Sequence, residues 1–390
     1  MRLVPLILLS LSALSQTLVL QTGTVLDGRG GVLRGQQITV RNGRIESLAP
    51  GTAKADYDLR SLTLMPGWID THVHLDWHFD PATGKLANRS GESPAQVALF
   101  AAENAWLTLM AGFTTVQSVG SATDALVRDR INNGSLPGPA ILTSLRQINN
   151  RSGDPQAIRA LVRQTKAEGA DVIKLFATLG LGAGGEQSMT DAQLEAACSE
   201  AKAQGLRAVV HAISSKGATA AVLAGCTSIE HGDYLDDATL KLMAARGVYF
   251  DPNFLVLHNY LDLKDKFDFP AASLASLEKA IAPSADVLKR AHALGVKVVF
   301  GTDAVAGAHG RNAEEFIYRV REAGEKPADA LISATSLAAE SLGLSKKIGT
   351  VGVGYDADLV ATEGNPLDDI TAVRRVVFVM RGGRVYRNGK

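Results

Sequence analysis

The chain has 390 residues, which is enough for one large domain and a second, smaller one. Hydrophobic residues make up 46% and charged residues 21%, an ordinary globular balance. The 40 Lys and Arg residues offset the 40 Asp and Glu residues, so the formal net charge is zero. Nothing in this balance favours a nucleic acid or an anionic membrane as a partner.

Residues 1–15 have the pattern of a secretory signal peptide. Arg2 precedes an apolar run from Leu3 to Leu14, and small residues stand at the offsets for cleavage before Gln16. The run is shorter than the ~20 residues that span a bilayer, and no later stretch is long and apolar enough. We therefore expect an exported protein, periplasmic or secreted, without a membrane span. The alternative is a buried N-terminal strand, because strand-like sequence follows.

Short alternating runs broken by glycines fill both ends of the chain, in residues 16–62 and 348–390. Asn42-Gly43, between "QQITV" and "RIESL", predicts a hairpin, and "VVFVM", "GG" and "RVYR" predict another near the end. We expect the two ends to form one small β-sandwich domain.

Residues 63–347 alternate between short apolar runs and helix-like segments, several of which end in Gly. Eight such runs, separated by amphipathic helices, predict an α/β fold with a parallel sheet covered on both faces, of the size of a (β/α)₈ TIM barrel. A doubly wound open sheet is the alternative. No G-x-G-x-x-G motif opens an early helix of this region, so a dinucleotide site lacks support.

The two cysteines, Cys198 and Cys226, are too few for a disulfide framework. They are not spaced as a metal-binding or redox pair. We expect both to be buried thiols.

The stretch "PGWIDTHVHLD" places His72 and His74 one residue apart after an apolar run. In an extended segment, side chains at i and i+2 share a face, so both imidazoles can meet one ligand. An isolated H-x-H is more often a polar turn, so the remaining strand ends decide the interpretation.

Four more chemically active residues stand at or near the ends of other apolar runs: Lys174 in "DVIKLFAT", His211 in "RAVVHA", His231 in "TSIEHG" and Asp303 in "VVFGTD". In a parallel barrel the carboxyl ends of all strands open onto one face. Imidazoles and carboxylates there suit zinc or a similar divalent ion. A buried Lys174–Asp303 ion pair is the alternative, but it leaves four histidines unexplained. The sharper hypothesis is that Lys174 is carboxylated and bridges two metal ions.

These motifs, with "GFTTV", "SIEHGDYLDD" and the tail "IGTVGVGYDADLVATEGNPLDDI", make the chain resemble the amidohydrolase superfamily over nearly its whole length. The superfamily consists of metal-dependent hydrolases on a (β/α)₈ barrel. Within it the chain looks most like the binuclear, imidazolonepropionase-like subgroup. Relatives there include Xaa-Pro and Xaa-Arg/Lys dipeptidases, N-acyl amino acid hydrolases and ochratoxin-hydrolysing amidases.

The resemblance implies a role for each matching residue. His72, His74 and Asp303 would bind the more buried of two divalent ions, most simply zinc. His211 and His231 would bind the second, and carboxylated Lys174 would bridge both. Asp303 would also orient a bridging hydroxide and move its proton to the leaving amine. Tyr234 would contact the substrate carbonyl or oxyanion, although it can equally be a loop aromatic.

Substrate contacts are less determined. The segment "LRQINNRSGDPQ" lacks the histidine found in many relatives, and its Arg146 and Arg151 would pair with a substrate carboxylate or stay solvated. His309 is a further candidate for a substrate contact. Glu230 should turn away from the metals, because neighbours on a strand point to opposite faces. The other three histidines, at positions 78, 258 and 292, are expected to be structural or exposed.

The leading functional hypothesis is hydrolysis of an amide in a dipeptide or N-acyl amino acid, with ochratoxin-like amides included. A lactonase or phosphotriesterase with the same metal pair is the alternative. A carboxylate-binding arginine in the mouth would favour the amidase, and an uncharged apolar mouth the alternative. A metal-binding scaffold without turnover is the third hypothesis. The partner is a small molecule in each enzyme case, and a homo-oligomer stays open.

Overall fold

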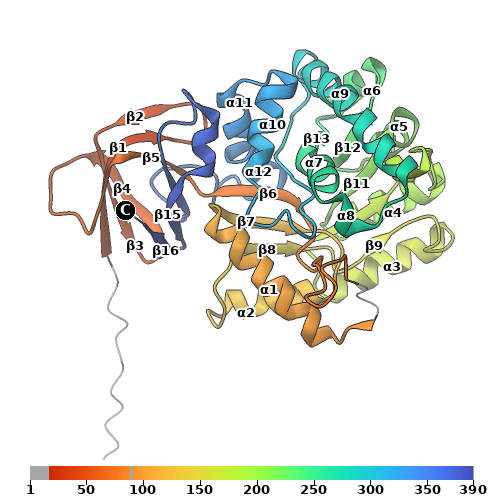
Figure 1. Ribbon diagram of the computed structural model, residues 1–390, viewed down its shortest axis with the longest axis horizontal. Coiled ribbons are helices and arrows are strands. Elements are labelled where there is room, and N and C mark those ends of the chain that lie inside the picture. Colours follow the sequence, from red (N-terminus) through yellow and green to blue (C-terminus); the bar gives the residue numbers. More distant parts are fainter. Residues whose placement is uncertain (1–16, 88–90, 390) are drawn as a thin grey trace, which may run out of the picture.

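The computed structural model describes residues 17–87 and 91–389. A small β-rich part and a larger α/β part lie side by side (Figure 1). The predicted signal peptide lies outside the described residues. Within them, no helix is both long and apolar enough to cross a membrane.

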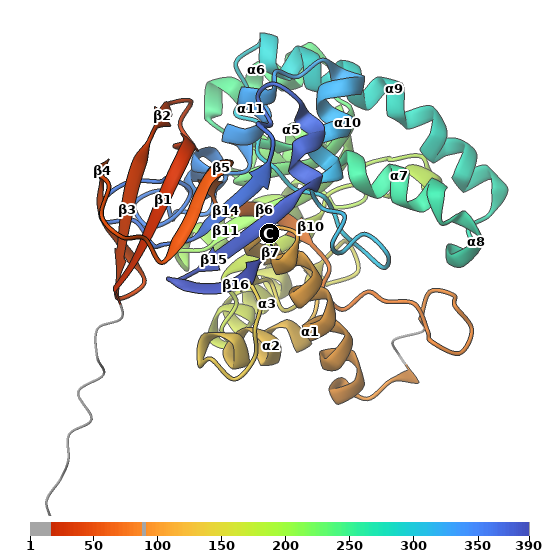
Figure 2. The same ribbon diagram turned by 60° about the vertical axis from the view of Figure 1, so that its left-hand side comes forward.

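Both chain ends contribute to one eight-stranded mixed sheet. Strand β14 runs antiparallel to β5 with Val360 opposite Met65, so the C-terminal strands lie beside the N-terminal ones (Figure 2). Alternate side chains such as Leu20, Ile38 and Phe378 are fully buried between strands of both ends. The two ends therefore share one core, as predicted, whereas the sandwich form stays a prediction. The strands are β1 (Thr17–Leu26), β2 (Val32–Arg34), β3 (Gln36–Arg41), β4 (Arg44–Pro50), β5 (Tyr57–Pro66), β14 (Leu359–Glu363), β15 (Val376–Arg381) and β16 (Arg384–Asn388).

The middle of the chain forms two parallel sheets, in the orders β6-β7-β8 and β13-β12-β11-β10-β9. Their strands are β6 (Trp68–Val73), β7 (Phe113–Ser118), β8 (Ala140–Thr143), β9 (Gln147–Ile148), β10 (Val172–Phe176), β11 (Arg207–Ser214), β12 (Ser228–Tyr234) and β13 (Tyr249–Asp251). Most residues of these strands are buried on both faces, which explains their continuous apolar sequences.

The two parallel sheets meet along both of their edges. On one side the segment 298–304 forms parallel bridges to both sheets. Val298 pairs with Phe250 of β13, and Ala304 pairs with Val73 of β6. On the other side the backbone N–H of Asp171, just before β10, donates to the carbonyl of Thr143 at the end of β8, at 2.8 Å. The fold is thus mixed α/β, with the strand ends of both sheets brought to one mouth.

Helices surround the parallel strands (Figure 1). Two begin with a Ser/Thr-x-x-Gln motif: Ser93 with Gln96 and Thr190 with Gln193 form reciprocal capping boxes. The helices are α1 (Pro94–Met110), α2 (Thr123–Asn132), α3 (Pro155–Ala167), α4 (Asp191–Ala203), α5 (Ser215–Leu223), α6 (Asp237–Arg246), α7 (Phe254–Asp262), α8 (Lys264–Phe267), α9 (Ala271–Ala293), α10 (Glu314–Ala323), α11 (Pro327–Ser333) and α12 (Ser336–Ser341), with short 3₁₀ turns η2 (Leu181–Ala183) and η3 (Ile370–Arg374).

The expectation of two buried thiols is wrong. Cys198 in α4 and Cys226 after α5 are joined by a disulfide, with Cα atoms 5.1 Å apart. Both residues are buried, as expected. The pairing depends on the packing of α4 against α5, which brings together residues 28 positions apart. Sequence spacing alone does not reveal that packing.

We expect the double variant Cys198→Ser/Cys226→Ser to lose about 3–4 kcal/mol of unfolding free energy, because the bond closes a loop of 28 residues in the unfolded chain. Urea unfolding with and without reductant checks this. The unfolded, unreduced wild type should also show no thiol that reacts with a colorimetric reagent. Two reactive thiols and a midpoint insensitive to reductant would contradict the disulfide.

Candidate metal centre

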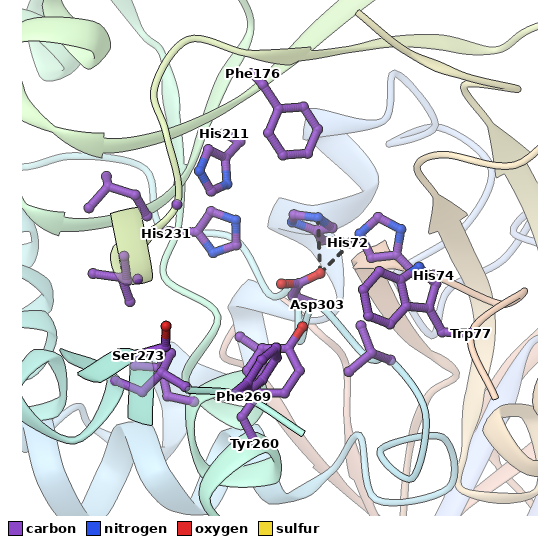
Figure 3. A pocket seen from close by; sticks show the side chains of 18 of the residues that line it. His72, His74, Trp77, Phe176, His211, His231, Tyr260, Phe269, Ser273 and Asp303 are labelled. Atoms are coloured by element: carbon purple, nitrogen blue, oxygen red, sulfur yellow. Dashed lines mark ion pairs between the residues drawn. The ribbon is translucent and has the colours of Figure 1, made fainter. Parts of the chain in front are cut away.

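Six side chains predicted from the strand ends converge at the mouth of the parallel sheets (Figure 3). The ring centroids of His72 lie 5.4 Å from those of both His74 and His231, and the rings of His211 and His231 are 4.6 Å apart. Their elements are β6 and the loop after it, β11 and β12. Residues far apart in sequence therefore meet at one place because parallel strands end at the same edge.

Lys174 and Asp303 lie between the histidines. The Nζ of Lys174 is 2.9 Å from Nε2 of His72. One carboxylate oxygen of Asp303 lies 3.4 Å from Nε2 of His72 and 3.1 Å from Nε2 of His74. Among the described residues Lys174 therefore contacts His72 rather than forming the ion pair with Asp303 that was the alternative interpretation.

Backbone strain helps to aim two of these side chains. His231 has a φ of 70° and Asp303 a φ of 50°, in the left-handed region that non-glycine residues rarely adopt. His231 lies within β12 and Asp303 just after the last apolar run, and at each the left-handed backbone interrupts the regular alternation of side chains. Strained residues of this kind cluster at functional sites.

The protonation states suit metal binding. Burial lowers the pKa of all three histidines closest to Lys174, to about 4 for His211 and well below the usual value for His72 and His231. Burial also lowers the pKa of Lys174. For Asp303 burial acts to raise the pKa, but the charges of His72 and Lys174 and a hydrogen bond from His74 outweigh it and bring the pKa to about 2. At neutral pH His72, His211 and His231 are thus neutral beside an ionised carboxylate, which is the ligand chemistry of zinc-like ions.

Distances between the donor atoms agree with that chemistry. One donor atom from each of His72, His231 and Asp303 lies within 4.8 Å of the others. A divalent ion fits among ligands so spaced without backbone rearrangement. The residues present therefore fit the metal that the donor set implies.

Glu230 does not leave the centre as predicted. Its Oε2 lies 2.9 Å from Nδ1 of His72, and its Oε1 accepts a hydrogen bond of 2.5 Å from the hydroxyl of Ser228. The left-handed backbone of His231 breaks the strand alternation on which the prediction rested. Glu230 thus supports His72 from below while His231 faces the mouth.

Two further carboxylates beneath the site were missed. Asp251 accepts a hydrogen bond from the hydroxyl of Thr71 at 2.6 Å, and Asp70 accepts from the hydroxyl of Thr302 at 2.7 Å. Asp70 and Asp251 are completely buried. An acidic residue inside an apolar strand, as in "WIDTH" and "YFDPN", was the available signal, because buried carboxylates need partners.

The six residues open into a cavity of about 430 Å³. Trp77 and Phe176 lie near the histidines, and Tyr260, Phe269 and Ser273 face them across the opening (Figure 3). The segment His258–Pro270 thus both packs and lines the cavity, since Tyr260 and Phe269 also contact each other edge to face at 5.0 Å.

The other candidates lie elsewhere. The Tyr234 side chain is 44% exposed at the end of β12, and among the described residues neither it nor Arg146 nor Arg151 lines the cavity. Arg146 forms an ion pair with Glu168. His309 is buried behind His74, with Nε2 3.1 Å from the His74 carbonyl.

The three remaining histidines have structural partners away from the centre. The ring of each lies 2.8–2.9 Å from a carboxylate, in the pairs His78–Glu92, His258–Glu322 and His292–Glu325.

The model of the amidohydrolase family matches residues 63–386, which include every residue of this centre. The chain belongs to the amidohydrolase family and is a hydrolase of that family.

Known relatives cover nearly the whole chain. Ochratoxinase from Aspergillus niger is 25% identical over 98% of this chain and 89% of its own length. A solved Xaa-Pro dipeptidase with bound methionine is 30% identical, with a TM-score of 0.87 over 96% of this chain and 100% of that one. A prolidase from Bifidobacterium longum, whose assignment is provisional, is also 30% identical, with a TM-score of 0.83 over 96% of both chains.

The position of His309 generates a prediction. His309→Ala should lower the unfolding free energy by about 1–3 kcal/mol, because it removes a buried hydrogen bond to the His74 carbonyl, which keeps only the backbone N–H of Trp77. The KM for any substrate should change little. Urea unfolding and steady-state kinetics on the same preparation separate the two effects. A large rise in KM at unchanged stability would instead place His309 against the substrate.

Proposed function

We propose that this hydrolase cleaves amide bonds of small molecules with a pair of divalent metal ions, most simply zinc. One observation carries the proposal: four imidazoles, a buried lysine and an ionised aspartate converge on one cavity. The similarity to an Xaa-Pro dipeptidase and to ochratoxinase supports amide bonds as the target. Dipeptides and N-acyl amino acids are the substrates that these relatives suggest.

His72, His74 and Asp303 would hold one ion, and His211 and His231 the other. When bound, two such ions supply a water of lowered pKa and polarise the scissile carbonyl. Asp303 would accept the proton of the attacking water and return it to the leaving amine.

Lys174 would bridge the ions as its carbamate. Burial lowers the pKa of Lys174 and so raises the share of its neutral amine, the form that adds to carbon dioxide with loss of one proton. The product would be an anionic ligand between four imidazoles. The ammonium form would instead repel the metal ions.

The architecture and location are part of the proposal. Contacts at both edges of the parallel sheets support a closed (β/α)₈ barrel over an open sheet. The Cys198–Cys226 disulfide supports export after cleavage at residue 15, because disulfides persist mainly in oxidising compartments.

A second candidate is hydrolysis of a lactone or phosphotriester. No arginine lines the cavity among the described residues, and most of its wall is apolar. The same metal pair can act on either kind of centre, so substrates must decide. We would assay dipeptides, N-acyl amino acids, simple amides, lactones and phosphotriesters in parallel. Turnover confined to lactones or phosphotriesters would overturn the amidase proposal.

Asp303→Asn tests the catalytic assignment. Hydrolysis should fall by about 10²–10⁴-fold, because the amide cannot accept the proton, while the fold is kept. Asp129→Asn on the exposed side of α2 is the matched control and should retain activity. Wild-type turnover by the Asp303 variant would remove the aspartate from the mechanism.

Glu230→Gln tests the support of His72. The Glu230 carboxylate lies 2.9 Å from Nδ1 of His72, while Nε2 of His72 lies 2.9 Å from Nζ of Lys174, so the loss of the carboxylate should weaken metal affinity by about 10–100-fold. Competition with a chromophoric chelator measures this without turnover. Glu322→Gln, which alters the matching pair with His258, is the control. Equal affinity in both variants would limit Glu230 to a structural role.

A further inference from the structure

Outside the metal centre, the part of the cavity wall that the structure describes carries no charged side chain. Among the described residues, every ionisable side chain that lines the cavity, apart from the tyrosine hydroxyl of Tyr260, belongs to the six of the metal centre. The rest of the wall is built from residues such as Trp77, Phe176, Leu257 and Leu277. Its polar side chains, Gln147, Ser273 and Tyr260, are uncharged at neutral pH.

Cations on nearby loops are already engaged. Lys85 pairs with Asp268 at 2.6 Å, beside the rim residue Phe269. Arg146 pairs with Glu168, and Arg311 lies 2.9 Å from Asp262 beyond α7. None of the three lines the cavity. Among the described residues, a substrate carboxylate in the apolar part of the cavity would therefore be desolvated without a cationic side chain.

The same reasoning applies to a free amino group. Asp303 is the one carboxylate on the wall of the cavity within the described residues, and it is a member of the metal centre. A free dipeptide carries both charges close to its scissile bond. Burying either charge unpaired is costly, so the wall selects against it.

We propose that the enzyme favours small amides whose groups on both sides of the scissile bond are uncharged and apolar, over free dipeptides and N-acyl amino acids. This inference rests on the proposed amide hydrolysis and narrows its substrate class. The cavity volume of about 430 Å³ falls within the range of about 300–1,000 Å³ that is common for small-molecule sites. Aromatic groups suit it best, because Trp77, Phe176, Tyr260 and Phe269 offer ring faces and edges.

A matched pair of compounds tests the substrate class. N-benzoyl-phenylalaninamide and N-benzoyl-phenylalanine share the benzoyl amide bond and differ in one carboxylate. The metal-loaded enzyme should hydrolyse the uncharged compound with at least about tenfold higher kcat/KM. A preference for the carboxylate would overturn the inference and leave amide hydrolysis intact.

A positive charge introduced on the cavity wall should shift the substrate preference, which gives a second test. Ser273→Arg, at the half-buried start of α9, should shift the preference by about tenfold or more towards the carboxylate. Ser276→Arg lies three positions along the same helix, outside the cavity, and should leave the preference unchanged. Equal shifts in both variants would show a long-range charge effect and overturn the role of the wall.

Binding separates the two proposals. If neither compound is hydrolysed, the result contradicts the proposed amide hydrolysis. Calorimetry on the metal-loaded protein then measures the affinities directly. Tighter binding of the uncharged compound supports the selective wall, and tighter binding of the carboxylate overturns it.

Discussion

The structure depends on the burial of basic side chains at the ends of parallel strands. Lys174 is 1% exposed and His72 is 1% exposed, with His211 and His231 packed beside them. Burial disfavours the charged form of these bases, so it lowers the pKa of Lys174 and brings that of His72 well below its usual value. The same burial that costs stability produces the ligand form of each imidazole. One arrangement therefore serves both the fold and the proposed metal site.

Carboxylates beneath the site complete this arrangement. Glu230, Asp251 and Asp303 all act to raise the pKa of Lys174 against the larger effect of burial. Gly301 allows Asp251 this position, because a Cβ at residue 301 would lie 2.0 Å from an Asp251 carboxylate oxygen. A glycine at position 301 is therefore needed for this arrangement, just as the carboxylate of Asp303 is. Together these groups hold His72 between a supporting carboxylate below and the cavity above.

Much of the site was predictable because its signals are local. His72 and His74 share a face at i and i+2, and Lys174 stands out as a lysine inside an apolar strand. The parallel strands then bring these residues to one edge. The contacts that the sequence did not reveal depend on an irregular backbone conformation or on the packing of helices. Glu230 reaches His72 because His231 leaves the regular strand conformation, and Cys198 meets Cys226 through helix packing. Arg146 and His309 were plausible by chain position, but their side chains turn to Glu168 and to the back of His74.

The central claim is that Lys174 joins the histidines in holding two metal ions. Its most direct test is the metal content per chain, by mass spectrometry, of protein purified with zinc and bicarbonate, compared with Lys174→Ala. The account predicts two ions per wild-type chain and a clear loss in the variant, with the fold retained by circular dichroism. A wild type without bound metal, or a variant with the same content as the wild type, would contradict it.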